Sequence, residues 1–182
     1  MKFIIAFLSF LIIFGFTSPD TKKTYDQKII DKAIQIHTKW KSSKNTVIIV
    51  DFSKPMEENR LFVVDVIKKQ ILIQTKTCHG VGSGKTSKPT KFSNEEGSLA
   101  SSLGVMKTGN TYYGSYGYSM LIDGLESTNS NARSRKIIFH SSKKQETPWS
   151  WGCFSMPEKD CKKVIDLTKG GSLIYASDGK DI

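Results

Sequence analysis

The chain has 182 residues, of which 38% are hydrophobic and 24% are charged, and its formal net charge is +10. This composition excludes a disordered or fibrous protein, and the length is typical of one globular domain with extra segments at its ends. A basic balance indicates attraction to anionic surfaces such as cell wall, membrane or nucleic acid.

The first 18 residues have the pattern of a secretory signal peptide. Met1 and Lys2 precede an almost unbroken apolar run, Phe3 to Phe16, and small residues follow it. The run is shorter than the roughly 20 apolar residues that a membrane span needs. We therefore expect residues 1–18 to be removed and the protein to be exported to the periplasm or cell envelope, with no membrane span after cleavage. An uncleaved N-terminal anchor is the alternative, and export argues against nucleic acid as a partner.

Residues 22–44 are predicted to form an amphipathic helix. Apolar side chains recur at spacings of three and four, at Tyr25, Ile29, Ile30, Ala33, Ile36 and Trp40. This spacing places them in one stripe with lysines opposite. We expect an N-terminal helical segment over residues 19–45 that packs on the domain formed by residues 46–182.

The rest of the chain has the pattern of a mainly β domain with short helices. Runs of β-branched residues predict six strands, at 47–52, 61–67, 71–77, 118–122, 136–140 and 172–176. Residues 79–98, rich in Gly, Ser, Lys and Thr, are predicted to form a long loop. Ser155 and Glu158 match a capping box, which predicts a helix that continues to about Thr168.

His140 and Cys153 are the candidate catalytic residues. His140 ends an apolar strand, and Cys153 lies just before the predicted helix, where backbone N–H groups can lower a thiol pKa and hold an anion. Gly152 lets the backbone approach a bound carbonyl. A thiolate, a base and N–H donors are the parts of an acyl-transfer site. The residues alone leave open a buried Cys153, or a disulfide with Cys78 or Cys161. No spacing of His and Cys predicts a metal site.

The run that contains His140 and Ser150-Trp151-Gly152-Cys153 resembles the signature of the murein L,D-transpeptidase catalytic-domain family. In that signature a His is followed, after a gap, by Ser-His-Gly-Cys. One branch of the family carries Trp in place of the second His, as Trp151 does here. Further segments resemble this branch, at 50–55, 60–62, 79–84, 91–94, 101–104, 117–119, 123–125 and 132–135.

The resemblance implies a sandwich-like β fold and acyl transfer on the stem peptides of peptidoglycan. Cys153 would attack the carbonyl that joins the third stem residue to the terminal D-amino acid. His140 would take the thiol proton, with its ring oriented by the carbonyl of Ser141. The oxyanion hole would consist of the backbone N–H groups of Trp151, Gly152 and Cys153.

The product is a thioester, which an amine of a neighbouring stem would resolve to form a cross-link. If water resolves it, the enzyme is an L,D-carboxypeptidase; a non-catalytic cell-wall-binding protein is a further alternative. The resemblance implies no metal or organic cofactor. Arg133 and Arg135 are candidates for binding a stem carboxylate, with a solvated charge pair as the alternative. Tyr118 is a candidate from a Gly-rich run of tyrosines that either line a groove or only pack, with Tyr112, Tyr113 and Tyr116.

Overall fold

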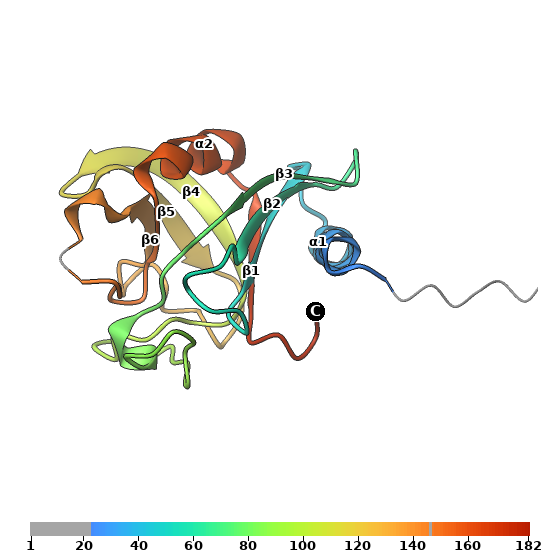
Figure 1. Cartoon of the computed structure of the whole chain (residues 1–182). Helices are drawn as coiled ribbons and strands as arrows, with labels where there is room; N and C mark the ends of the chain where they lie inside the picture. Colours follow the sequence, from blue (N-terminus) through green and yellow to red (C-terminus); the bar gives the residue numbers. More distant parts are fainter. Residues whose placement is uncertain (1–22, 146) are drawn as a thin grey trace, which may run out of the picture.

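The computed structural model describes residues 23–145 and 147–182 (Figure 1). The predicted signal peptide, residues 1–18, lies outside the described residues. Neither α-helix in the described part of the chain has the length and the apolar composition of a membrane span. The helices and strands in chain order are α1 Tyr25–Trp40, β1 Thr46–Asp51, β2 Leu61–Asp65, β3 Gln70–Thr75, β4 Gly104–Gly114, β5 Gly117–Gly124, β6 Ile138–Ser141, β7 Phe154–Met156, α2 Glu158–Thr168 and β8 Leu173–Ser177.

The eight strands form one continuous sheet in the order β3-β2-β1-β8-β4-β5-β6-β7. The pairs β1–β8 and β6–β7 are parallel, and the other neighbours are antiparallel. The sheet curls so that β1 and β2 face β4, β5 and β6, with α2 across one end (Figure 1). The enclosed core takes side chains from both halves and from α2, among them Val50, Val63, Ile122, Phe139, Phe154 and Val164. The prediction of a mainly β, sandwich-like fold with short helices is confirmed.

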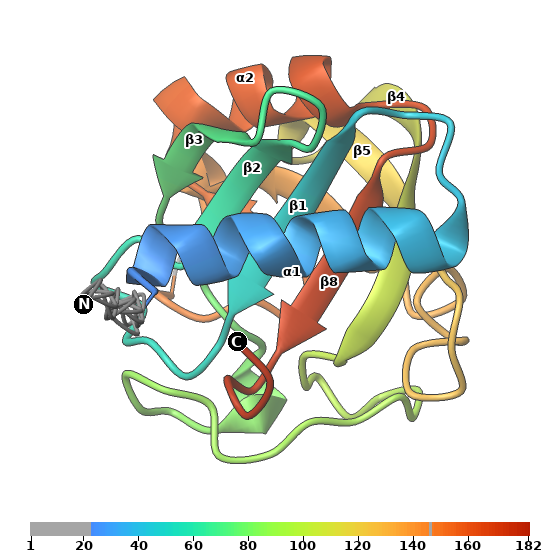
Figure 2. The ribbon, with the colours of Figure 1, turned by 90° about the vertical axis from the view of Figure 1, so that its right-hand side faces the viewer.

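Helix α1 covers the outer face of the sheet over β1, β2 and β8 (Figure 2). Its apolar stripe is buried there against Val47, Ile49, Phe62, Val64 and Leu173. The helix begins after Thr24, whose hydroxyl accepts a hydrogen bond from the backbone N–H of Gln27, and it ends at Lys41, which has a φ of 48°. The predicted amphipathic helix is therefore present, but it is shorter at both ends than 22–44.

Strands β4 and β7 were not predicted. β4 holds three glycines, and Gly is depleted in strands because it loses the most backbone entropy there. β7 has only three residues, too few to show a periodic pattern. Both segments are strands because they pair with neighbouring strands. β4 lies between β8 and β5, and β7 pairs with β6.

The predicted capping box is wrong. Ser155 lies inside β7, and its hydroxyl is 2.8 Å from Sγ of Cys78 instead of capping a helix. α2 begins at Glu158 after Pro157, and no side chain caps it. Strand pairing of the Ser155 backbone therefore overrides the local capping pattern.

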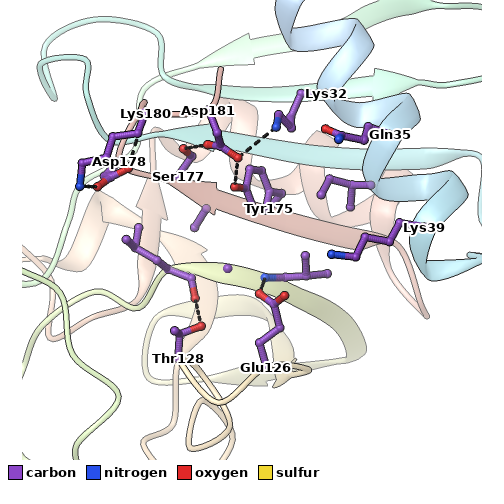
Figure 3. A pocket seen from close by; sticks show the side chains of 15 residues that line it. Lys32, Gln35, Lys39, Glu126, Thr128, Tyr175, Ser177, Asp178, Lys180 and Asp181 are labelled. Atoms are coloured by element: carbon purple, nitrogen blue, oxygen red, sulfur yellow. Dashed lines mark hydrogen bonds and ion pairs between the residues drawn. The ribbon is translucent and has the colours of Figure 1, made fainter.

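A groove of about 370 Å³ lies between α1 and the turn that contains Glu126 (Figure 3). At one end, Asp181 accepts hydrogen bonds from Lys32, Tyr175 and Ser177. These contacts tie the C-terminal segment to α1 and β8. None of the predicted site residues lines this groove.

The packing of α1 on the sheet can be tested at Ile29, which is fully buried. Ile29→Ala should lower the free energy of unfolding by about 2–5 kcal/mol, because it removes buried methyl groups and leaves a cavity. Thr38→Ala, on the exposed face of the same helix, should change it by less than about 0.5 kcal/mol. Urea unfolding followed by circular dichroism measures both. Equal effects of the two substitutions would contradict this packing.

Candidate active site

Cys153 and His140 come together because β6 and β7 pair in parallel. The register sets His140 opposite Ser155, two residues after Cys153. Side chains two residues apart in an extended segment point to the same face of a sheet. Cys153, Ser155 and His140 therefore share one face, while Phe139 and Phe154 point into the core from the other. The topology makes neighbours of two residues that are well separated in the sequence.

The ring of His140 is buried, and its tautomer is set by its neighbour. Nδ1 is 2.9 Å from the carbonyl oxygen of Ser141. A carbonyl oxygen only accepts, so Nδ1 carries the proton and Nε2 keeps a free lone pair. Burial lowers the pKa of His140 below its usual value of 6.5. The ring of Tyr116 lies over it, with 4.3 Å between centroids. His140 is thus a neutral base at pH 7 with one nitrogen available.

The thiol of Cys153 is protonated at rest. Its Sγ is 3.6 Å from the carbonyl oxygen of Lys136, to which the thiol donates. Burial raises the pKa of Cys153 to about 11. The expected lowering by a helix N-terminus is wrong, because β7 separates Cys153 from the start of α2. Within the described residues no hydrogen bond joins Cys153 to His140.

All three cysteines are free thiols in this structure. Cys161 is buried in α2. Sγ of Cys78 lies 3.9 Å from the carbonyl oxygen of Cys153 and close to Ser155. Cys153 is therefore available as a thiol nucleophile.

The turn before Cys153 has a tightly constrained backbone. Gly152 has a φ of 109°, and a Cβ there would lie 2.7 Å from the carbonyl oxygen of Ala100, so only glycine fits. The Ser150 hydroxyl accepts from the N–H of Gly152 and donates to the carbonyl of Cys153. The N–H groups of Trp151 and Cys153 have no acceptor within the described residues. Of the three predicted oxyanion donors, two are free and that of Gly152 is already bound.

A buried network holds the neighbouring segment 77–84 in place. The guanidinium of Arg60 is fully buried and donates to the carbonyl of Thr77 and to Nδ1 of His79. His79 Nε2–H in turn donates to the carbonyl of Gly84, 3.0 Å away. A Cβ on Gly80 would lie 2.8 Å from the backbone nitrogen of Gly152. This segment therefore packs directly against the turn before Cys153.

The candidate substrate-binding residues lie in different surroundings. Arg133 makes a two-pronged ion pair with Asp123, with both N–O distances 2.8 Å. The hydroxyl of Tyr118 donates to Asp166 on α2. Arg135 lies close to Gly152, but its hydrogen bonds go to residues 93–102. Of the three, only Arg135 adjoins the turn that carries Cys153.

Two tyrosines of the β4–β5 hairpin are more closely associated with the site than Tyr118. Tyr116 stacks on His140. Burial raises the pKa of Tyr112, and the nearby charge of an ionised Cys153 raises it further. A hairpin register could have suggested which tyrosines share a face, but β4 had no strand pattern to provide one.

The comparisons with known proteins identify the family of this chain. Residues 20–177 match the family described as L,D-transpeptidase catalytic domain. No match was found among curated proteins.

Several solved structures are similar to this chain, and those with a TM-score above 0.5 share its fold. They include the helical cell shape determining protein Pgp2 of Campylobacter jejuni, with 11% identity and a TM-score of 0.54 over 88% of this chain and 58% of that one. Bd1075 of Bdellovibrio bacteriovorus has 17% identity and a TM-score of 0.52 over 75% and 50%. An L,D-transpeptidase of Stackebrandtia nassauensis has 15% identity and a TM-score of 0.47 over 81% and 64%.

The chain spans between half and two thirds of the length of these three proteins. At such low identities the structural likeness concerns the fold alone. The family match, in contrast, covers most of the sequence. The chain therefore belongs to the L,D-transpeptidase catalytic-domain family.

Proposed function

We propose that this protein is an exported, cysteine-dependent L,D-transpeptidase that acts on the stem peptides of peptidoglycan. The observation that carries the proposal is the shared face of β6 and β7. His140 pairs with Ser155, two residues after Cys153, and the Nδ1 of its ring is bound to the carbonyl oxygen of Ser141. The N–H groups of Trp151 and Cys153 are free to donate. A nucleophile, a base and oriented donors are what acyl transfer requires.

The reaction begins with proton transfer. Nε2 of His140 takes the thiol proton while the sulfur of Cys153 attacks the carbonyl carbon between the third stem residue and the terminal D-amino acid. The N–H groups of Trp151 and Cys153 hold the oxyanion, and the carbonyl of Ser141 stabilises the imidazolium. His140 then protonates the leaving amine, the C–N bond breaks, and a thioester remains.

The second half resolves the thioester. An amine of a neighbouring stem loses its proton to His140 and attacks the acyl carbon, the thiolate leaves, and His140 returns the proton to Cys153. The product is a new amide, which is a cross-link. With water as the nucleophile, the same steps give an L,D-carboxypeptidase, the alternative activity.

Exposed apolar side chains next to the nucleophile support a peptide-binding role. The ring of Trp151 is 71% exposed although the two residues beside it in the sequence are held tightly. Tyr112, Tyr113 and Tyr116 are exposed as well, and several exposed aromatic side chains are more typical of a binding surface than a single one. We infer that Trp151 and Tyr116 contact the stem peptide. A non-catalytic wall-binding protein would not need the buried, oriented ring of His140.

Product analysis tests the activity directly. Residues 19–182 of the wild type, incubated with muropeptide tetrapeptides, should release the terminal D-amino acid and form dimers, measured by liquid chromatography with mass spectrometry. Cys153→Ala should abolish both, because it removes the thiol that forms the thioester. Release without dimers would favour the carboxypeptidase. No release from several stem types would contradict the proposed function.

The pH dependence of kcat/KM tests the role of His140. The rate should fall on the acid side with an apparent pKa below 6.5, because burial lowers the pKa of His140 and only the neutral ring can accept the thiol proton. Activity is thus expected in full at neutral pH and lost as the pH falls through that lowered value. An apparent pKa above 6.5 for the loss of kcat/KM at acid pH would count against this role. So would the same pH dependence in His140→Asn.

A further inference from the structure

The guanidinium of Arg135 is bound almost entirely by one segment of chain. Nη1 donates to the carbonyl of Ser93 at 2.8 Å and to the hydroxyl of Ser102 at 2.6 Å. Nη2 donates to the carbonyl of Ala100 at 2.5 Å and to the hydroxyl of Ser98 at 3.3 Å. An arginine has five N–H donors. Four are therefore occupied, and only Nε–H is left for a substrate.

The segment that Arg135 binds forms a wall of the turn before Cys153. The carbonyl oxygen of Ala100 would lie 2.7 Å from a Cβ on Gly152, and Nη2 of Arg135 would lie 3.3 Å from it. Leu99 has a φ of 53°, a region that is unfavourable for a leucine. A strained residue persists only where its surroundings hold it. Here Arg135 binds Ser98 and Ala100, the residues on both sides of Leu99. The carbonyl of Leu99 accepts a hydrogen bond from the N–H of Gly82.

Arg135 also has no carboxylate partner within the described residues. Its positive charge lowers the pKa of Cys153, in opposition to the larger effect of burial. A partly buried charge without a hydrogen-bonded carboxylate is unfavourable for folding alone, although the charge of Glu96 offsets part of this cost. Its position therefore fits a role in the reaction better than a role in stability.

We propose that Arg135 is a positioning residue for acyl transfer, whose planar fork holds Ala100 against Gly152 and thereby sets the direction of the free N–H groups of Trp151 and Cys153. This inference rests on the proposed function. It replaces the expectation that Arg135 binds a stem carboxylate. The proposed role needs the planar guanidinium of an arginine, because a lysine ammonium is a point charge that cannot reproduce four hydrogen bonds in one plane.

The test compares Arg135→Lys and Arg135→Gln with Lys159→Gln, an exposed control on α2. Arg135→Lys should lower kcat by about 100-fold, the loss typical of a small misplacement of reacting groups, with a smaller change in KM. The pH midpoint of Cys153 labelling by an alkylating reagent should stay near that of the wild type, since the charge remains. In Arg135→Gln the midpoint should also rise. A kcat restored by lysine would overturn the proposal in favour of a pure charge effect.

Ser102→Ala is a milder variant that removes one of the four bonds and keeps the arginine. Its kcat should fall between those of the wild type and Arg135→Lys, and circular dichroism should show an unchanged fold. The amide resonances of Trp151 and Cys153, followed by two-dimensional NMR, should shift in the same order. Amide positions and kcat identical to the wild type would overturn the proposal, even if the arginine variants fail to fold.

These readouts separate the two proposals. If the wild type shows no turnover that depends on Cys153, the proposed function fails. The amide shifts and the labelling profile still decide whether Arg135 positions the turn. If turnover is present but unaffected by the arginine variants, only the positioning role fails.

Discussion

The parallel pairing of β6 and β7 determines whether this protein has a site at all. Side chains alternate between the faces of a sheet, so a slip of one residue would turn Cys153 into the core and Phe154 out to solvent. Two contacts hold the register. The rings of Phe139 and Phe154 lie 5.1 Å apart in the core, and the N–H of Cys78 donates to the carbonyl of Ser155 from the far side of β7. A strand of three residues is thus fixed by its packing and by partners on both edges.

Burial shifts the pKa values of the nucleophile and the base in opposite directions, and both shifts favour the neutral form. The pKa of Cys153 rises and that of His140 falls, so both are neutral at pH 7. A resting thiol reacts slowly with oxidants and stray electrophiles, which attack the thiolate. Proton transfer is then coupled to the arrival of substrate, when an oxyanion can form beside the free N–H groups. The charge of Arg135 makes that transfer easier without ionising the thiol beforehand.

The sequence predicted the parts of the fold that have a periodic pattern. The apolar runs of β1, β2, β3, β5, β6 and β8 and the stripe of α1 all appear as strands and helix. β4 and β7 have no such pattern, because their pairing partners decide their structure. Because β7 was not predicted, Cys153 was expected to lie directly before a helix, and its pKa was expected to be lowered instead of raised. Within the site, His140 and Cys153 followed from a motif, but the hydrogen bonds of Arg135 and the stacking of Tyr116 depend on residues far away in the chain.

Two arginines hold segments that pack against the same glycine, Gly152, and within the described residues neither has a carboxylate hydrogen-bonded to its guanidinium. Arg60 acts through His79, which binds Gly84 and fixes the segment that presses Gly80 against Gly152. Arg135 acts through the carbonyl of Ala100, which packs against Gly152. Backbone carbonyls neutralise no charge, so the guanidinium of Arg135 remains cationic next to the turn before Cys153. Oxyanion donors are effective only when their direction is set before the reaction. Clamping one peptide between two fixed segments is a direct way to achieve this, and it explains why the turn admits no side chain at Gly152.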